Sequence, residues 1–310
     1  MTLPAVPRLR IDAPSAPIPQ RFGLFSASTV IDNADPHSLT GVEYEVVCST
    51  QVDPYPAACL PLPPDVSRVK QAVPTTGVGF GTPFGVYAAD DCALGRDPDT
   101  ARRQLRQRFL AGEQTQVERI VRTGLLGNYP NLELEAVPIG PGTALPVPTA
   151  IGLLEQWLSV NYGGVGVIHA PRTVAPYLGT MPELTIQDGQ AVTIFGSVWA
   201  FGTGYTGDPP DHPAADDENT VWLYATPPVT VRRSRLIEPA GWDSGAFDIA
   251  QNIGFLLDER LYVVDWPCGT AAVKTTLPRV YATPTPVPPA PPQPEPPAGG
   301  TGDPARSATA

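Results

Sequence analysis

The sequence is poor in the residue types that mark several classes of functional site. Its 310 residues include three histidines and four cysteines, which are Cys48, Cys59, Cys92 and Cys268. No two cysteines form a CxxC pair, and no histidine lies at metal-ligand spacing from a cysteine. We therefore expect no metal site and no cofactor. The cysteines are expected to be structural thiols, with a disulfide such as Cys48–Cys59 as the alternative if the protein ends up outside the cell.

Positive charge is also scarce. Lysine and arginine total 20 against 31 aspartates and glutamates, so the formal net charge is −11. Binding to phosphate backbones needs a basic face, which argues against a sequence-specific nucleic acid ligand. The sequence has no apolar run of about 18 residues, the length of a membrane span, and its start lacks the apolar centre of a signal peptide. We expect assembly in a cytoplasm and no membrane partner.

Proline and glycine are abundant, with 40 and 29 residues, and both favour turns and extended segments. Residues 1–40 carry no lasting pattern, which predicts an N-terminal arm with a short strand at residues 22–25. Residues 281–310 predict a Pro-rich tail, a disordered or semi-rigid spacer that buries no core.

Residues 41–96 predict an extended β-arm. Residues 42–47 alternate between apolar and polar side chains, which is typical of a strand. Residues 80–89 predict a returning strand that is broken at Pro83. The long connection between the two strands has no periodicity, and loops of this length usually contact something.

A single long helix is predicted over residues 98–123, within a segment that spans residues 97–147. Asp97 can cap its first turn, Pro98 suits the first helical position, and Gly124 suits the residue after its end. At about 1.5 Å per residue this helix would be roughly 38 Å long. One apolar stripe runs along it, formed by Leu105, Phe109, Val117, Ile120 and Val121.

Residues 148–240 predict an α/β lobe. Helices are expected at 148–161 and 171–178, around an apolar strand at 165–168 that is buried on both faces. Residues 187–190 predict a hairpin turn, and the remaining strands are expected at 184–186, 192–195, 198–201, 221–226 and 229–237. Residues 241–280 predict the closing strands, and in residues 256–263 the alternation makes one face drier than the other. The expected fold class is α+β.

Three passages of the chain resemble tailed-phage major capsid proteins, whose fold is shared by encapsulin shells. ARRQLRQRFLAGEQTQVERIVRTG resembles the spine helix of that family. TAIGLLEQWLSVNYGGVGVIHAPRTVAPYL resembles the helix–strand–helix of its apical domain, and FDIAQNIGFLLDERLYVVDWPCGTAAVKTTL resembles the last strands of its peripheral domain. The resemblance covers residues 40–280. It implies a phage-capsid-like fold with an N-terminal arm, an extended β-arm, a long spine helix, an α/β apical lobe and a C-terminal long-stranded sheet.

The resemblance implies a structural shell subunit, not an enzyme, that assembles with copies of itself into an icosahedral virion capsid around a genome. Decoration, portal or scaffold proteins are further partners of such a shell. A neighbour's arm is expected to lie over the long helix, so that arginines of the helix meet carboxylates of the arm. The residues expected to hold the assembly or the subunit together are Arg102, Arg106, Phe109, Glu113, Glu118, Glu43 and Glu45. Lys70 and Lys274 are interpreted as solvated charges, and no crosslinking set can be assigned.

The sequence also fits other classes of function. An encapsulin-type nanocompartment shell and a phage tail or baseplate ring protein would use the same arms. A carbohydrate-directed hydrolase or binding module would use Trp199, Trp222 and Trp242, but no carboxylate pair stands out beside them.

Individual candidates for catalysis or metal binding are weak. His169 ends an apolar strand without a serine or cysteine nucleophile motif, and we interpret it as a hydrogen-bonded histidine at the edge of the lobe. His212 lies in an acidic loop that lacks the spacing of a calcium site. The charges at residues 258–260 are interpreted as a cross-strand or intersubunit pair.

Overall fold

The computed structural model describes residues 20–48, 52, 76–93, 97–179, 181, 184–205, 219–238, 247–248 and 253–277. All of them belong to the unit Met1–Leu277 of the chain. Several predicted features lie outside these residues: the first part of the N-terminal arm, the connection between the arm strands, the acidic loop with His212, and the Pro-rich tail.

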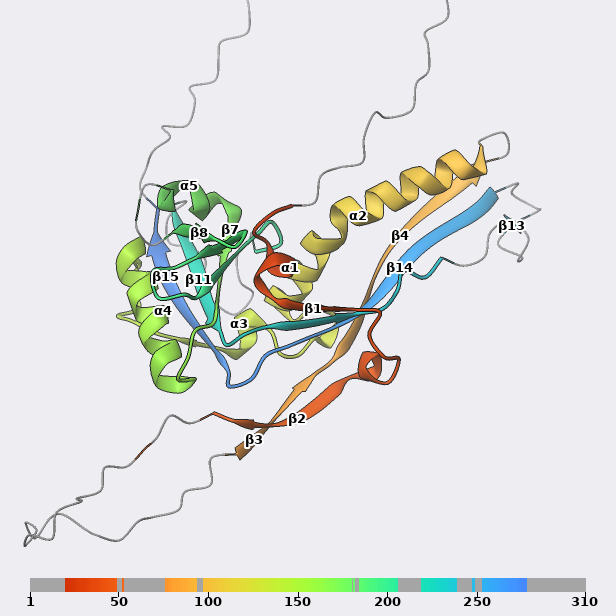
Figure 1. Cartoon of the computed structure of the whole chain (residues 1–310). Helices are drawn as coiled ribbons and strands as arrows, with labels where there is room; N and C mark the ends of the chain where they lie inside the picture. Colours follow the sequence, from red (N-terminus) through yellow and green to blue (C-terminus); the bar gives the residue numbers. More distant parts are fainter. Residues whose placement is uncertain are drawn as a thin grey trace, which may run out of the picture. The chain divides into compact units, whose positions relative to one another are not determined.

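Helices of very different length alternate with strands along the chain (Figure 1). The α-helices are α1 (Leu24–Ala27), α2 (Pro98–Thr123), α3 (Leu132–Glu135), α4 (Val147–Asn161) and α5 (Ala175–Leu178). Short 3-10 helices are η1 (Ser38–Thr40), η2 (Leu125–Gly127) and η3 (Arg172–Val174).

Five strands form one sheet around the long strand β14. Strand β14 pairs on one side with β4 and on the other with β12 and β13, and β12 pairs in parallel with β1. The bounds are β1 (Thr29–Asp32), β4 (Pro83–Ala93), β12 (Thr230–Arg233), β13 (Phe247–Asp248) and β14 (Ile253–Asp265). A separate two-stranded ribbon pairs β2 (Val42–Val47) with β3 (Thr76–Gly81) in antiparallel register. We call this pair the β2–β3 ribbon.

Eight strands form a second, mixed sheet in the order β5-β15-β11-β7-β10-β9-β8, with β6 also paired to β15. The bounds are β5 (Ala136–Pro138), β6 (Leu145–Pro146), β7 (Val167–Pro171), β8 (Thr185–Gln187), β9 (Gln190–Val192), β10 (Val198–Gly202), β11 (Thr220–Thr226) and β15 (Thr270–Thr276). Every residue of β7 is buried, so the prediction of a strand buried on both faces is confirmed for residues 167–168. The predicted start is wrong, because Val165 lies before β7 and is 48% exposed. The hairpin turn at residues 187–190 is also confirmed, with left-handed backbone at Asp188 (φ 50°) and Gly189 (φ 81°).

The two sheets exchange strands along the sequence. Strands β11 and β12 are consecutive in the chain but lie in different sheets, and so do β14 and β15. We had expected β12 with the apical lobe and β15 with the closing strands, whereas β12 pairs with β14 and β15 pairs with β11. Strand pairing therefore does not follow the predicted boundary at residue 240. The five-stranded sheet includes β12, which precedes this residue, and the eight-stranded sheet includes β15, which follows it.

Helix α2 has the ends that its sequence predicts. The Asp97 side chain accepts a hydrogen bond from the Thr100 backbone N–H (2.9 Å), and Gly124 is left-handed with φ 68°. The Gly124 N–H donates to the Ile120 carbonyl oxygen (3.0 Å). All five residues of the predicted stripe are buried, and the helix lies along β4 and β14 (Figure 1).

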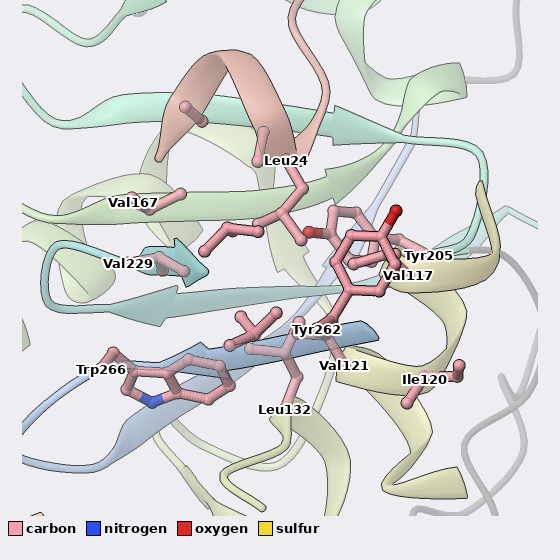
Figure 2. Close-up of a cluster of buried hydrophobic side chains, with 14 of the residues drawn as sticks. Leu24, Val117, Ile120, Val121, Leu132, Val167, Tyr205, Val229, Tyr262 and Trp266 are labelled. Carbon is pink, nitrogen blue, oxygen red and sulfur yellow. The ribbon is translucent and has the colours of Figure 1, made fainter. Parts of the chain in front are cut away.

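Two large apolar cores hold the unit together. The first is formed by α1, α2 and strands of both sheets, and Figure 2 shows Val117 and Val121 of α2 beside Leu24, Tyr205 and Tyr262. The second lies between α4 and the eight-stranded sheet, and its large members are Leu154, Leu158, Ile168, Trp199 and Leu223. A smaller cluster under the start of α2 contains Ala101, Leu105 and Leu256.

The predicted strand at residues 22–25 is wrong, because these residues form a turn and the start of α1. Tertiary hydrogen bonds decide the local structure. The Phe201 N–H donates to the Phe22 carbonyl oxygen (2.6 Å), and the Leu24 N–H donates to the Glu118 carboxylate (3.1 Å). Since β1 then pairs with β12, residues 20–32 contact both sheets.

Residues 125–148 are more structured than predicted. We expected an extended segment, but it contains η2, α3 and the short strands β5 and β6. Asn131 caps α3, since its side-chain oxygen accepts a hydrogen bond from the Leu134 N–H (2.8 Å).

Candidate functional site

Glu113 is a buried carboxylate at the centre of a polar cluster between α2 and the five-stranded sheet. It accepts hydrogen bonds from Arg233 (3.3 Å), from Arg260 and from the Tyr262 hydroxyl. Arg233 also pairs with Asp32 of β1. One side chain of the helix is therefore joined to β12 and β14, and through Arg233 to β1. Two guanidinium groups face two carboxylates, so the formal charges of the cluster cancel.

Burial and charge shift the titration of this cluster. Burial, together with the charge of Glu113, raises the pKa of Tyr262 well above its usual range, so the phenol keeps its proton and remains a donor. A hydrogen bond from Arg233 lowers the pKa of Asp32. Around neutral pH, Tyr262 therefore stays protonated as a donor and Asp32 stays charged as an acceptor.

Glu118 is fully buried and ties three segments of the chain together. Its carboxylate accepts hydrogen bonds from the Leu24 N–H (3.1 Å), the Gly204 N–H (3.1 Å) and the Gln114 side chain (3.0 Å). Burial raises the pKa of Glu118, and the hydrogen bonds oppose this shift. A Cβ at Gly204 would lie 2.4 Å from the Thr115 carbonyl oxygen, so this close approach requires glycine.

Arg106 binds two carboxylates near the start of α2. It pairs with Glu238, and its Nε lies 3.7 Å from Oδ2 of the buried Asp258. Burial raises the pKa of Asp258, while Arg106 and Arg102 oppose the shift. An open groove of ≈ 340 Å³ borders this cluster, lined by Asp99, Arg102, Arg103, Arg106, Glu238 and Asp258.

Of the two arrangements expected for the charges at residues 258–260, the cross-strand pair is wrong and the intersubunit pair stays a prediction. Asp258 and Arg260 lie on the face of β14 that α2 covers, where Asp258 meets Arg106 and Arg260 meets Glu113. These contacts join residues of β14 to the helix within one subunit. Local sequence patterns do not reveal these partners, because they lie far along the chain.

Glu43 and Glu45 are exposed on one face of the β2–β3 ribbon. Each is paired in register with an exposed apolar residue of β3, Glu43 with Phe80 and Glu45 with Val78. Val47 is also exposed on this face (59%). The outward face of the β2–β3 ribbon is thus both acidic and apolar. Among the described residues, neither glutamate forms an ion pair with an arginine of α2.

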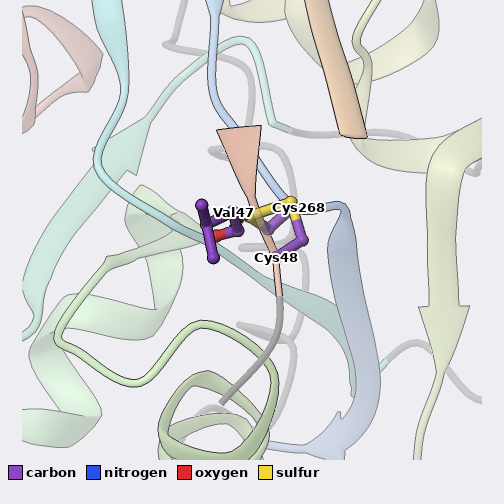
Figure 3. Close-up of a disulfide and its surroundings, with 3 residues drawn as sticks. All are labelled: Val47, Cys48 and Cys268. Carbon is purple, nitrogen blue, oxygen red and sulfur yellow. Dashed lines mark hydrogen bonds between the residues drawn. A yellow bond between two sulfur atoms is a disulfide. The ribbon is translucent and has the colours of Figure 1, made fainter. Parts of the chain in front are cut away.

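Cys48 and Cys268 form a disulfide (Figure 3), with 5.0 Å between their Cα atoms. The expectation of thiols is wrong for these two residues, and the alternative Cys48–Cys59 pairing is wrong as well. The partners are 220 residues apart in the sequence, and the fold brings them together because the end of β2 lies beside the turn between β14 and β15. Cys59 lies outside the described residues.

His169 is a core residue, although we had expected it at the edge of the lobe. It is fully buried in β7, with Nδ1 3.0 Å from the Tyr205 hydroxyl and Nε2 2.9 Å from the Thr226 hydroxyl. Burial lowers its pKa to about 3, so the ring is neutral. Both ring nitrogens have partners within the core.

The tryptophans do not form a carbohydrate-binding platform in the described part of the chain. Trp199 is fully buried and stacks on Phe201 (5.0 Å between ring centroids). Trp222 is half-buried against the first core, and Trp242 lies outside the described residues. The described residues contain no group of three or more His, Cys, Asp or Glu side chains placed to hold a metal ion. No helix among them is both long and apolar enough to cross a membrane.

The seven candidate residues fall into three places. Buried inside the subunit's own fold are Phe109, Glu113 and Glu118. At the groove beside the start of α2 are Arg102 and Arg106. On the outward face of the β2–β3 ribbon are Glu43 and Glu45. Sequence reasoning missed the partners of the buried carboxylates, which are Arg233, Arg260, Tyr262, Leu24 and Gly204, and it missed the pairing of Arg233 with Asp32.

Comparison with known proteins identifies the fold. No family model and no curated protein matches the sequence. Among solved structures, the capsid of Ralstonia phage GP4 matches with a TM-score of 0.51 at 9% identity, over 88% of this chain and 96% of that one. The capsid of an empty GTA particle matches with the same TM-score at 10% identity and the same coverage. A chain of Microbacterium phage Oxtober96 matches with a TM-score of 0.51 at 12% identity, over 86% of this chain and 95% of that one.

The chain therefore has the α+β fold of these phage and GTA capsid structures, as the resemblance implied.

Proposed function

We propose that this chain is the structural subunit of a virus-like icosahedral capsid and assembles with copies of itself to enclose a genome. The observation that carries the proposal is the shared fold, which extends over 88% of this chain and 96% of the Ralstonia phage GP4 capsid chain. The proposed role is structural and not enzymatic. Because the Ralstonia phage GP4 and GTA structures are capsids, an encapsulin-type compartment and a tail or baseplate ring are not favoured.

Exposed apolar side chains support a role in assembly. On the face of β4 and β14 away from α2, Tyr87 is 70% exposed, Phe255 is 47% exposed and Leu261 is 39% exposed. Phe80 and Val78 are exposed on the β2–β3 ribbon. Exposed apolar side chains that gather on one face often mark an interface, and a shell subunit would cover them with neighbouring copies.

Charge suggests how neighbouring copies meet. We infer that Glu43 and Glu45 of one subunit pair with arginines of α2 in the next, such as the half-buried Arg102 and the exposed Arg119. The exposed position of both glutamates and of Arg119 supports this inference. Phe109, Glu113 and Glu118 would instead brace the subunit that presents these surfaces.

The proposal extends to the setting of assembly. Assembly in the host cytoplasm, together with scaffold, portal or decoration proteins, is the expected setting for such a shell. A net charge of −11 makes sequence-specific binding of the enclosed nucleic acid by this chain unfavourable.

Electron microscopy of the purified chain under assembly conditions tests the proposal. We expect closed particles, and only monomers or small rings would contradict it. Glu43→Lys together with Glu45→Lys should reduce the particle yield without changing the melting temperature of the free subunit. Asp188→Lys, at the exposed β8–β9 turn, is the matched control and should assemble as the wild type does.

A further inference from the structure

The β2–β3 ribbon packs closely against the rest of the subunit at one of its ends, where Phe80 also stacks on Tyr129 (4.4 Å between ring centroids). We call the end at Val42 and Gly81 the near end. There, a Cβ added to Gly81 would lie 2.9 Å from the Val263 side chain of β14, so the two strands touch closely. The next residue, Thr82, donates its N–H to the Tyr129 carbonyl oxygen (2.9 Å).

The other end of the β2–β3 ribbon is held differently. We call the end at Val47 and Thr76 the far end. At Gly77, the nearest atom to an added Cβ belongs to Val46 of the same ribbon, 3.8 Å away. A hollow of ≈ 200 Å³ lies beside this end, lined by Gly77, Gly79, Trp266 and the two bonded cysteines among others. Among the described residues, side chains therefore pack less closely at the far end than at the near end.

The Cys48–Cys268 disulfide links this far end to the body. Cys48 directly follows the last residue of β2, and Cys268 lies in the turn between β14 and β15. That turn is the point where the chain passes from the five-stranded to the eight-stranded sheet. The bond thus fixes the ribbon at the position where the chain continues into residues 49–75.

The surroundings of Cys48 and Cys268 are compatible with both the disulfide and the two free thiols. Both cysteines are half-buried, so small redox reagents can reach the sulfur atoms. The Cys268 Sγ lies 3.5 Å from the Val47 carbonyl oxygen (Figure 3), which can accept a hydrogen bond from the reduced thiol. Cys268 is left-handed (φ 61°) and is followed by Gly269 (φ 82°). Glycine would adopt this conformation more easily than cysteine, so the crosslink accounts for a cysteine here.

We propose that the Cys48–Cys268 disulfide is a redox latch on the β2–β3 ribbon. The latch is open in a reducing cytoplasm and closes when the assembled protein meets an oxidising milieu. The setting rests on the proposed function, since a capsid is built in one milieu and released into another. When the latch closes, the acidic and apolar face of the ribbon is held at a fixed angle to the body and to any neighbour that it contacts.

The closing reaction is thiol–disulfide exchange with a small disulfide such as oxidised glutathione. One cysteine thiolate attacks the glutathione disulfide and releases one glutathione thiolate. The second cysteine thiolate then attacks the mixed disulfide, forms the Cys48–Cys268 bond and releases the second glutathione. Two protein thiols are oxidised, one glutathione disulfide is reduced to two glutathione molecules, and the two protons pass from the protein thiols to the glutathione thiolates.

The first test uses the full free chain in oxidised and reduced glutathione buffers. Peptide mapping should find Cys48 bonded to Cys268 in the oxidised sample. Hydrogen exchange of residues 42–47 and 76–81 should be at least about tenfold faster in the reduced sample. The variant Cys48→Ser should exchange at the fast rate in both buffers, whereas the control Cys59→Ser with Cys92→Ser should behave as the wild type does. Free thiols at both positions in the oxidised buffer, or equal exchange in the two buffers, would overturn the proposal.

The second test uses assembled particles. Dithiothreitol should lower the temperature at which wild-type particles dissociate, and it should leave particles of Cys268→Ser unchanged. If particles that carry the disulfide dissociate at the same temperature with and without dithiothreitol, the latch proposal is overturned, while the proposed capsid function is unaffected. If the chain forms no particles, the capsid function fails, and the exchange experiment on the free chain still decides whether the latch exists.

Discussion

Glu113 shows how one buried side chain can hold a helix to a sheet. Its carboxylate accepts from Arg233, Arg260 and Tyr262, so replacing it with a neutral amide leaves two guanidinium groups close together with less compensation. We expect Glu113→Gln to lower the free energy of unfolding by about 3–5 kcal/mol, as when one partner of a buried ion pair is removed. Urea denaturation of the free subunit measures this change.

Glu43→Gln is the matched control for that experiment. It makes the same chemical change at an exposed position of β2, where a surface substitution changes the free energy of unfolding by about 0.5 kcal/mol or less. Equal losses for the two variants would mean that the Glu113 cluster does not hold α2 in place.

His169 makes the stability of the subunit dependent on pH. Its pKa falls from 6.5 to about 3 in the folded chain because the ring is buried. The unfolded chain therefore binds a proton below pH 6.5 while the folded chain does not, and stability falls as the pH drops from 6.5 toward 3. The slope from this residue approaches about 1.4 kcal/mol per pH unit.

Denaturation between pH 8 and pH 4.5 checks this slope. The variant His169→Gln should be less stable at pH 8 and should lose less stability than the wild type on acidification. His37→Gln, which replaces an exposed histidine, should follow the wild-type curve. Parallel curves for the wild type and His169→Gln would contradict the prediction.

Residue partners were the part of the structure that the sequence could not reveal. The contacts of Glu113 span 120 to 149 residues, and no local spacing rule reaches that far. The stripe that contains Phe109 was predictable, because helical periodicity is a local signal. Cys268 was not predictable as the partner of Cys48, since four cysteines allow several pairings.

Among the elements, α2 was predictable because its start, stripe and end are all written in neighbouring residues. Its stripe supports a further prediction: Phe109→Ala should lower the free energy of unfolding by about 3–5 kcal/mol, since the ring is 2% exposed in the first core. Thermal or urea denaturation measures the loss.

The adjacent residue supplies the control. Leu110 is 50% exposed, and Leu110→Ala should change the free energy of unfolding by about 0.5 kcal/mol or less. A larger effect at Leu110 than at Phe109 would show that the stripe faces away from the core.

The short elements were harder to predict, for two different reasons. Helix α1 depends on the Glu118 carboxylate, which comes from a distant part of the chain. Helix α3 has a local signal that we did not use, because Asn131 is a good N-cap and acidic residues follow it in the first turn.

For the whole molecule, the predicted order of segments agrees with the capsid fold, but pairing between sheets does not follow that order. Which strands of a sheet are neighbours depends on contacts that are distant in sequence. One prediction concerns the Pro-rich tail. The free energy of unfolding of a chain that ends at Val280 should differ from that of the full chain by about 0.5 kcal/mol or less, since such a segment is expected to bury little apolar surface. Urea denaturation of both chains checks this, and a loss of soluble folded protein would contradict it.

The exchange of strands between the sheets also governs how the chain can fold while it is being made. Strand β15 lies between β5 and β11, inside the eight-stranded sheet, yet it is the last strand that the structure describes. Translation at ordinary speed needs roughly 5–20 s to pass from the end of β7 to the end of β15. Throughout that interval the eight-stranded sheet cannot close, because β15, the neighbour of β11, has not yet been made.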